Sequence, residues 1–283
     1  MVGKNTMSNP LERYFRQPAI YIKLPSDGQY YPEGAISVPV NREFPVYPMT
    51  AMDEITLRTA DALFNGNAVI NVVRSCLPNI LEPWHMPGID IDTVLVAIRI
   101  ASYGHDMDIE SKCPQCEEVG SFTVDLRQIL ERIGRPDFGK TVSIGDLEIF
   151  FKPISYKQQN QNSIAQFEDQ KLIESVPDSD ISEEDKLRLI NEAFVKLGQL
   201  SISTMADSIS AIKADDDLVT ERSFIDSFVQ NCDRKIYTLI RDHLSDLRSQ
   251  MTIKPLAIAC NSCQHQYETP FTLDASHFFV SGS

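Results

Sequence analysis

Apolar positions in the first part of the chain follow the pattern of short strands. Residues 19–24 alternate between apolar and polar positions, as a strand with one buried face does. Two short apolar runs, residues 36–40 and 44–47, predict two more strands joined by a turn near Asn41 and Arg42. The first 48 residues also contain seven prolines, which neither donate to a sheet ladder nor continue a helix. We therefore expect residues 1–49 to form an extended, Pro-rich arm. Its tyrosines either dock on a partner or pack on the arm's own domain.

Helical spacing begins at Thr50, which has Asp53 three residues later, as in a capping box. After Gly66, apolar residues recur at helical spacing as far as Cys76. Asp90 is expected to cap a further helix that ends at Gly104. Residues 106–112 then predict a strand. Residues 141–144 and 147–151 predict a hairpin whose turn lies at Gly145 and Asp146.

Residues 156–250 have a different character and predict three amphipathic helices, at about 156–175, 183–213 and 219–249. Ser182 is expected to cap the second of these helices, with Asp185 at the fourth position. The region carries 18 acidic and 11 basic residues. The three consecutive aspartates at 215–217 are interpreted as a solvated N-terminal cap of the third helix, because carboxylates stabilise the positive end of a helix dipole.

Two cysteine pairs carry the most specific chemical signal in the chain. Cys113 and Cys116 are separated by two residues, as are Cys260 and Cys263. This spacing lets both sulfur atoms of one tight turn face the same ion, and four thiolates complete a closed tetrahedral Zn²⁺ site. Similar strand-like runs follow the pairs, Phe-Thr-Val-Asp from residue 122 and Phe-Thr-Leu-Asp from residue 271. We interpret the pairs as the two halves of one zinc ribbon.

The ribbon requires the 143 residues between Cys116 and Cys260 to form an insertion. Closing a loop of that length costs about 4–5 kcal/mol, whereas a structural zinc site contributes about 10–16 kcal/mol. The alternatives are four reduced cysteines without a role, two disulfides, or a redox pair. His265 is a conceivable substitute ligand. Because four sulfur ligands leave no open position for water, the expected zinc is structural.

The predicted fold class is α+β, with a split four-cysteine zinc ribbon and an inserted acidic helical bundle. The expected organisation has four parts: the arm at 1–49, a small helical region with the first knuckle and a β-hairpin at 50–155, the inserted acidic helical subdomain at 156–250, and the second knuckle at 251–283. Cys76 and Cys232 lie outside the pairs and are expected to be small core residues on helices.

Charge and hydropathy restrict the partners and the compartment. The net charge is −14, and no cluster of Lys and Arg lies beside the knuckles, which disfavours binding to nucleic acid. No apolar run is long enough to cross a bilayer. The polar first residues do not have the pattern of a signal peptide, so we expect a reducing cytoplasm, which favours zinc over disulfides.

The sequence lacks the common catalytic motifs for phosphate binding, nucleophilic hydrolysis and zinc proteolysis. His105 with Asp106 and Asp108 is the best acid–base candidate, and a surface turn after Gly104 explains it better. We expect the protein not to be an enzyme, with no catalytic and no cofactor-binding residues apart from the metal ligands.

Several stretches in a fixed order resemble the baseplate hub family of T4-like contractile-tailed bacteriophages. The resemblance rests on Leu-Pro-Ser-Asp-Gly from residue 24, Val-Tyr-Pro-Met-Thr-Ala-Met-Asp-Glu from residue 46, Ala-Leu-Phe-Asn-Gly from residue 62, Ala-Ile-Arg-Ile-Ala-Ser-Tyr-Gly from residue 97, and the first knuckle. It covers about residues 19–126 and returns at the second knuckle.

This resemblance implies a structural protein of the viral tail baseplate hub, assembled in the host cytoplasm. Its partners would be other hub proteins or the tape measure protein, with no nucleic acid and no membrane. The resemblance leaves open whether such a protein is a permanent virion component or an assembly factor. A tape measure chaperone absent from the mature virion is one alternative. A zinc-ribbon nucleic-acid accessory protein is another.

Overall fold

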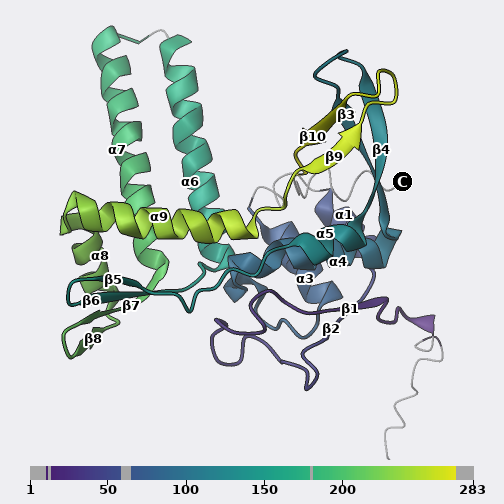
Figure 1. Cartoon of the computed structure of the whole chain (residues 1–283), viewed down its shortest axis with the longest axis horizontal. Helices are drawn as coiled ribbons and strands as arrows, with labels where there is room; N and C mark the ends of the chain where they lie inside the picture. The colour runs from purple at the N-terminus through teal and green to yellow at the C-terminus, as the bar shows by residue number, and fades with distance from the viewer. Residues whose placement is uncertain (1–10, 12–13, 59–64, 179–180, 272–283) are drawn as a thin grey trace, which may run out of the picture.

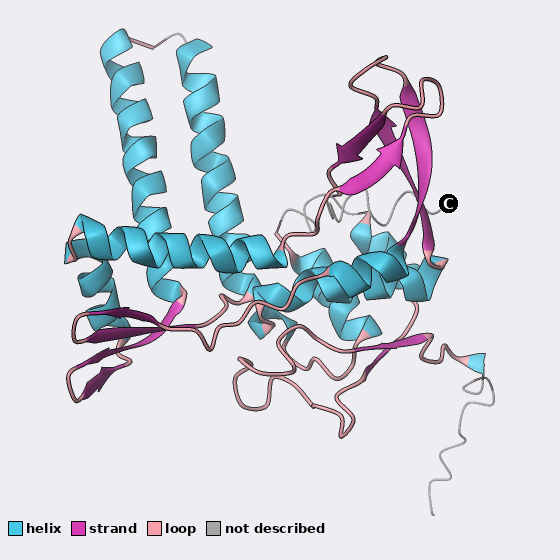
Figure 2. Cartoon of the chain, in the orientation of Figure 1, coloured by secondary structure: helices cyan, strands magenta, loops and turns pink. Residues whose placement is uncertain are grey.

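The chain was analysed in a computed structural model, which describes residues 11, 14–58, 65–178 and 181–271. The α+β class is confirmed, since helices and small antiparallel sheets both occur (Figure 2). Buried apolar side chains gather in two clusters, and a pair of hairpins stands beside the first cluster (Figure 1). Among the described residues, no helix is long and apolar enough to cross a membrane.

The first core contains the arm and the early helices. In chain order its elements are β1 (Ile20–Ile22), β2 (Phe44–Val46), α1 (Ala51–Leu57), α3 (Asn67–Cys76), the 3-10 helix η2 (Pro83–His85), α4 (Gly88–Tyr103) and α5 (Leu126–Arg132). The helix α4 is buried on nearly all sides, which explains its continuous run of apolar residues. The capping box at Thr50 and Asp53 is confirmed.

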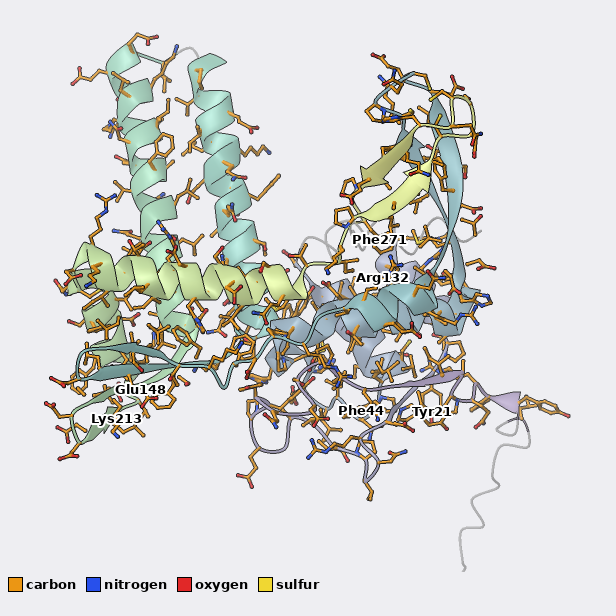
Figure 3. The ribbon with its side chains drawn as sticks, viewed as in Figure 1. Tyr21, Phe44, Arg132, Glu148, Lys213 and Phe271 are labelled. Atoms are coloured by element: carbon orange, nitrogen blue, oxygen red, sulfur yellow. The ribbon has the colours of Figure 1, made fainter. Side chains whose placement is uncertain are left out.

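The arm packs on this core. β1 and β2 form an antiparallel pair, and Leu24, Phe44 and Val46 are buried. Figure 3 labels Phe44 and Tyr21 on this pair, and Tyr21 is exposed. Arg16 fixes the start of the arm, because its guanidinium donates to the carbonyl oxygens of Pro48 (2.6 Å) and Ser75 (2.7 Å). The predicted strand at 36–40 is wrong, since this stretch makes only an isolated bridge between Ile36 and Ile80.

Asp90 does not cap α4 as predicted. The helix begins earlier, after Pro87, so Asp90 lies inside the first turn and is fully buried. Its carboxylate accepts hydrogen bonds from the Ser26 backbone N–H (2.8 Å), the Ser26 hydroxyl (2.6 Å) and the Tyr31 hydroxyl (2.9 Å). Asp90 therefore ties the arm to the central helix. Burial outweighs these bonds and raises the pKa of the Asp90 carboxyl to about 6.

The second core combines a sheet with three of the four helices of this region, together with Ile89 of α4. The sheet has the order β5-β6-β7-β8 and is antiparallel throughout. The elements are β5 (Val142–Ile144), β6 (Leu147–Phe151), α6 (Tyr156–Ser175), the 3-10 helix η3 (Val176–Asp178), α7 (Glu183–Asp207), β7 (Ile209–Ala214), β8 (Asp217–Val219), α8 (Arg222–Asn231) and α9 (Arg234–Met251). The predicted hairpin at 141–151 and the bounds of the first helix are confirmed. The Ser182 cap of α7 is also confirmed.

Two of the three predicted helices in this region differ from the structure. The second ends at Asp207, and residues 209–214 add a strand beside β6, with Lys213 opposite Glu148 (Figure 3). The third is divided into α8 and α9, because Asp233 starts a new helix by accepting from the Ile236 N–H. The aspartates at 215–217 do not cap a helix: Asp215, at φ 51°, and Asp216 form the β7–β8 turn, and Asp217 begins β8.

The two cores meet where α9 returns the chain towards α5. An added Cβ at Gly134 would clash with the Gln250 carbonyl, so the backbones are in direct contact there. Cys76 is buried at the end of α3, as predicted. Cys232 is only half-buried and follows α8. Residues 62–64 of the Ala-Leu-Phe-Asn-Gly stretch and residues 272–274 of the second strand-like run lie outside the described part of the chain. The predicted domain boundaries remain predictions.

Replacing Asp90 tests the buried link between arm and helix. Asp90→Ala leaves three buried donors without an acceptor, and we expect a loss of about 2–5 kcal/mol in the free energy of unfolding. Asp90→Asn keeps an acceptor for the Ser26 N–H and should lose less. Urea unfolding at several pH values measures both effects.

The same experiment has a pH signature. The folded-state pKa of Asp90 lies above the ordinary value of 3.8, so folding takes up a proton between pH about 4 and 6. The stability that comes from the raised pKa of Asp90 is therefore fully present below pH about 4 and is lost as the pH rises through about 6. Asp90→Asn should lack this decline. Equal dependence of the unfolding free energy on pH in the unmodified protein and in Asp90→Asn would contradict the assignment.

Candidate metal centre

The four cysteines predicted as ligands lie together. The sulfur atoms of Cys113, Cys116, Cys260 and Cys263 are all within 4.8 Å of one another. The Cys113–Cys263 sulfur distance is 3.7 Å, and the Cys116–Cys260 distance is 3.6 Å. A tetrahedral zinc with Zn–S bonds of about 2.3 Å separates its sulfurs by about 3.8 Å, whereas a disulfide bond measures about 2.0 Å. The spacing therefore fits four ligands around one ion, and all four thiols are free.

Each cysteine pair lies at the turn of an antiparallel hairpin. The first turn joins β3 (Asp106–Lys112) to β4 (Val119–Asp125), which confirms the strand predicted at 106–112. The second turn joins β9 (Leu256–Ala259) to β10 (Gln266–Thr269). The hairpins lie side by side (Figure 1), and the Ser111 and Thr269 hydroxyls are hydrogen-bonded at 3.0 Å.

The two turns have the same hydrogen-bond pattern. In the first, the Cys113 N–H donates to the Glu118 carbonyl and the Glu117 N–H donates to the Cys113 carbonyl, both at 2.9 Å. In the second, the Cys260 N–H donates to the His265 carbonyl and the Gln264 N–H to the Cys260 carbonyl, also at 2.9 Å. Two segments far apart in sequence thus build the same knuckle, and each contributes two sulfur atoms.

One conformational detail of the knuckles could not be seen in the cysteine spacing. The residue after the second cysteine of each pair has a left-handed backbone, with φ 60° at Glu117 and 62° at Gln264. A side chain in this region costs about 1–2 kcal/mol relative to the right-handed form. The sequence signal for this conformation is the position directly after the second cysteine. Glycine would adopt the left-handed form there without strain.

The thiols differ in their electrostatic surroundings. The backbone N–H groups of Cys263 and Ser262 lower the pKa of the Cys260 thiol to about 7. At Cys116, a backbone hydrogen bond from Glu118 acts in the same direction, but the neighbouring thiols outweigh it and raise the pKa to about 12. Four thiolates at this spacing repel one another, and a bound divalent cation supplies the charge that lets all four ionise.

The two paired hairpins are anchored to the first core at the end opposite the cysteines. Leu256 and Phe271 are buried in that cluster, and Figure 3 labels Phe271 where β10 leaves the hairpin. Cys113 and Cys260 are buried, whereas Cys116 and Cys263 are exposed. In the described part of the chain, the four cysteines are the sole cluster of three or more His, Cys, Asp or Glu ligand atoms. His265 lies outside it and has its ring near Tyr267, with 6.3 Å between ring centroids.

Comparison with known families found a match that spans most of the chain. Residues 19–280 match the family described as T4 bacteriophage base plate protein, a span that contains both knuckles and everything between them. The chain belongs to this family. Searches of the curated proteins and of the solved structures found no match.

The family places this baseplate protein in the phage tail and implies contacts with other baseplate and tail proteins. The resemblance predicted from the order of the sequence motifs is thus confirmed at the level of the baseplate. The hub position is a finer statement and stays a prediction, as does the identity of the metal.

Relief of the left-handed strain provides a test of the knuckle geometry. Gln264→Gly should raise the free energy of unfolding by about 0.5–1 kcal/mol, because the lost strain exceeds the added chain entropy of glycine. Ser262→Gly, in the same turn but without a positive φ, should lower stability. Urea unfolding of both variants with metal present measures the difference. A destabilised Gln264→Gly protein would contradict the turn.

Proposed function

We propose that this protein is a non-enzymatic component or assembly factor of the phage tail baseplate hub, acting through protein–protein contacts. The observation that carries the proposal is the family match over residues 19–280. The resemblance of the arm, the early helices and the first knuckle to hub proteins supports the hub position within the baseplate. The lack of a catalytic motif in the sequence agrees with a structural role.

In this proposal the four cysteines hold a structural Zn²⁺ that joins the two hairpins into one split zinc ribbon. The donor set supports zinc, because thiolates are soft ligands and four of them fill a tetrahedral shell. The ion would supply no reaction chemistry. Its contribution would be to fix the return point of the 143-residue segment between the two pairs.

A second candidate is an assembly factor that holds the tape measure protein or a hub subunit and is absent from the mature virion. The exposed apolar side chains of Leu187, Phe194 and Val195 on α7 favour this role, since an exposed apolar surface suits a temporary partner. A zinc-ribbon nucleic-acid accessory protein has less support, because Glu117 and Glu118 are exposed at the first knuckle and the chain is strongly acidic.

Quantitative mass spectrometry of purified particles tests the proposed function. A copy number in fixed symmetric ratio to a known baseplate protein identifies a permanent hub component. Absence from particles together with presence in tail-assembly intermediates identifies an assembly factor. Absence from both would contradict a role in the hub.

Removal of one ligand tests the metal. Cys113→Ser should lose about one zinc per chain and most of its solubility, because the metal contributes about 10–16 kcal/mol to folding. Cys232→Ser is the matched control outside the cluster and should keep its zinc. Elemental analysis of the soluble protein gives the readout. A soluble, folded Cys113→Ser protein without metal would contradict a structural site.

A further inference from the structure

The α6–α7 hairpin projects from the rest of the molecule (Figure 1). No residue of α6 is buried, and the buried residues of α7 are Ala193 near its middle and Met205 and Ala206 at its base. Helices of 20 and 25 residues with so little buried surface present most of their side chains to solvent. Their outer faces are thus available for contacts with another protein.

One outer face of α7 carries an apolar stripe. Leu187, Phe194 and Val195 are 63%, 58% and 59% exposed, and their spacings of seven and one residues place them on one side of the helix. Towards the base, Ile202 and Met205 continue the same side and pack in the second core. The exposed stripe therefore continues, towards the outer end of α7, the same helix face that packs in the second core.

Gly198 lies on this stripe, between its exposed and covered parts. An added Cβ there would meet nothing within 4 Å, so the fold itself does not require a glycine at this position. Glycine in a helix interior costs about 1 kcal/mol relative to alanine. Its absent side chain does permit a second helix to approach the α7 backbone closely. A shallow, open hollow of about 520 Å³ lies on the same helix, lined by Arg188, Asn191, Glu192, Val195 and Lys196.

Charge selects the kind of helix that fits. Glu183 and Glu184 are exposed at the outer end of the stripe. Lys186 pairs with Glu183 at 3.0 Å and Arg188 with Asp185 at 2.9 Å, so these two cations do not balance Glu184. A third cation, Lys196, lies farther along α7 and lines the hollow beside Glu192. A second copy of this chain, with net charge −14, would bring like charges together. A partner with basic residues would instead be attracted to Glu183 and Glu184.

We propose that the outer face of α7 docks a basic amphipathic helix of another tail protein, with apolar residues of that helix on Leu187, Phe194 and Val195 and its lysines or arginines beside Glu183 and Glu184. The inference rests on the proposed role in protein–protein contacts. It names the surface and the partner chemistry, and it holds for either a permanent component or an assembly factor.

A synthetic helical peptide is the probe. It carries leucines at i, i+3, i+4 and i+7 spacing with lysines on the flanks, and a control peptide has the same composition in scrambled order. Fluorescence anisotropy with the full chain should detect the first peptide only. Phe194→Ser should weaken binding about tenfold or more, as truncation of a central aromatic anchor does. Phe224→Ser, equally exposed on α8, should not.

Two further variants separate docking from folding. Gly198→Leu should raise the melting temperature, because leucine favours a helix, yet weaken peptide binding by filling the approach to the stripe. Glu183→Lys with Glu184→Lys should weaken binding most at low salt, whereas Asp215→Lys with Asp216→Lys in the β7–β8 turn should have less effect.

Equal binding by the Phe194→Ser and Phe224→Ser proteins would overturn the proposal. So would a concentration-dependent dimer that Phe194→Ser abolishes, since the stripe would then be a self-association surface. Particle mass spectrometry reports on the hub role independently, so a failed peptide experiment with the protein present in particles would overturn the docking surface alone.

Discussion

Everything between Cys116 and Cys260 leaves one point of the molecule and returns to it, because the sulfur atoms of the two cysteine pairs lie within 4.8 Å of one another. The cluster decides where both ends of that segment lie. β3 and β4 are held next to β9 and β10, and the anchored Phe271 fixes this unit on the first core. The second core, formed by the segment together with Ile89 of α4, then packs where Gly134 meets the end of α9. A single local site thus sets the arrangement of two cores.

The features that sequence reasoning recovered are those decided by neighbouring residues. The helix caps at Thr50 and Ser182 depend on residues three positions apart, and the knuckles depend on two-residue cysteine spacing. The prediction that Asp90 caps α4 is wrong because the partners of Asp90, Ser26 and Tyr31, lie in the arm, about sixty residues away in sequence. A carboxylate early in a helix has the same local pattern whether it caps that helix or binds a distant segment.

The error at residues 209–214 has a different physical origin. Ile209 and Ile212 continue the helical spacing of α7, and they also pack in the second core as residues of a strand. Residues 209–214 form a strand because they pair with the edge of β6. The pairing of β6 with β7 joins residues 58 to 67 positions apart. The residues near Ile209 in the sequence do not reveal this pairing. The contact between Gly134 and Gln250 is likewise not visible from the residues near either one.

The separation of the two knuckles also has a consequence for the nascent chain. A ribosome adding about 5–20 residues per second needs roughly 7–30 s to pass from the first pair to the second. During that interval Cys113 and Cys116 form only half a site, and a chain that stops early never gains the other two sulfurs. The two hairpins can therefore lie together only in a chain that includes the whole intervening segment.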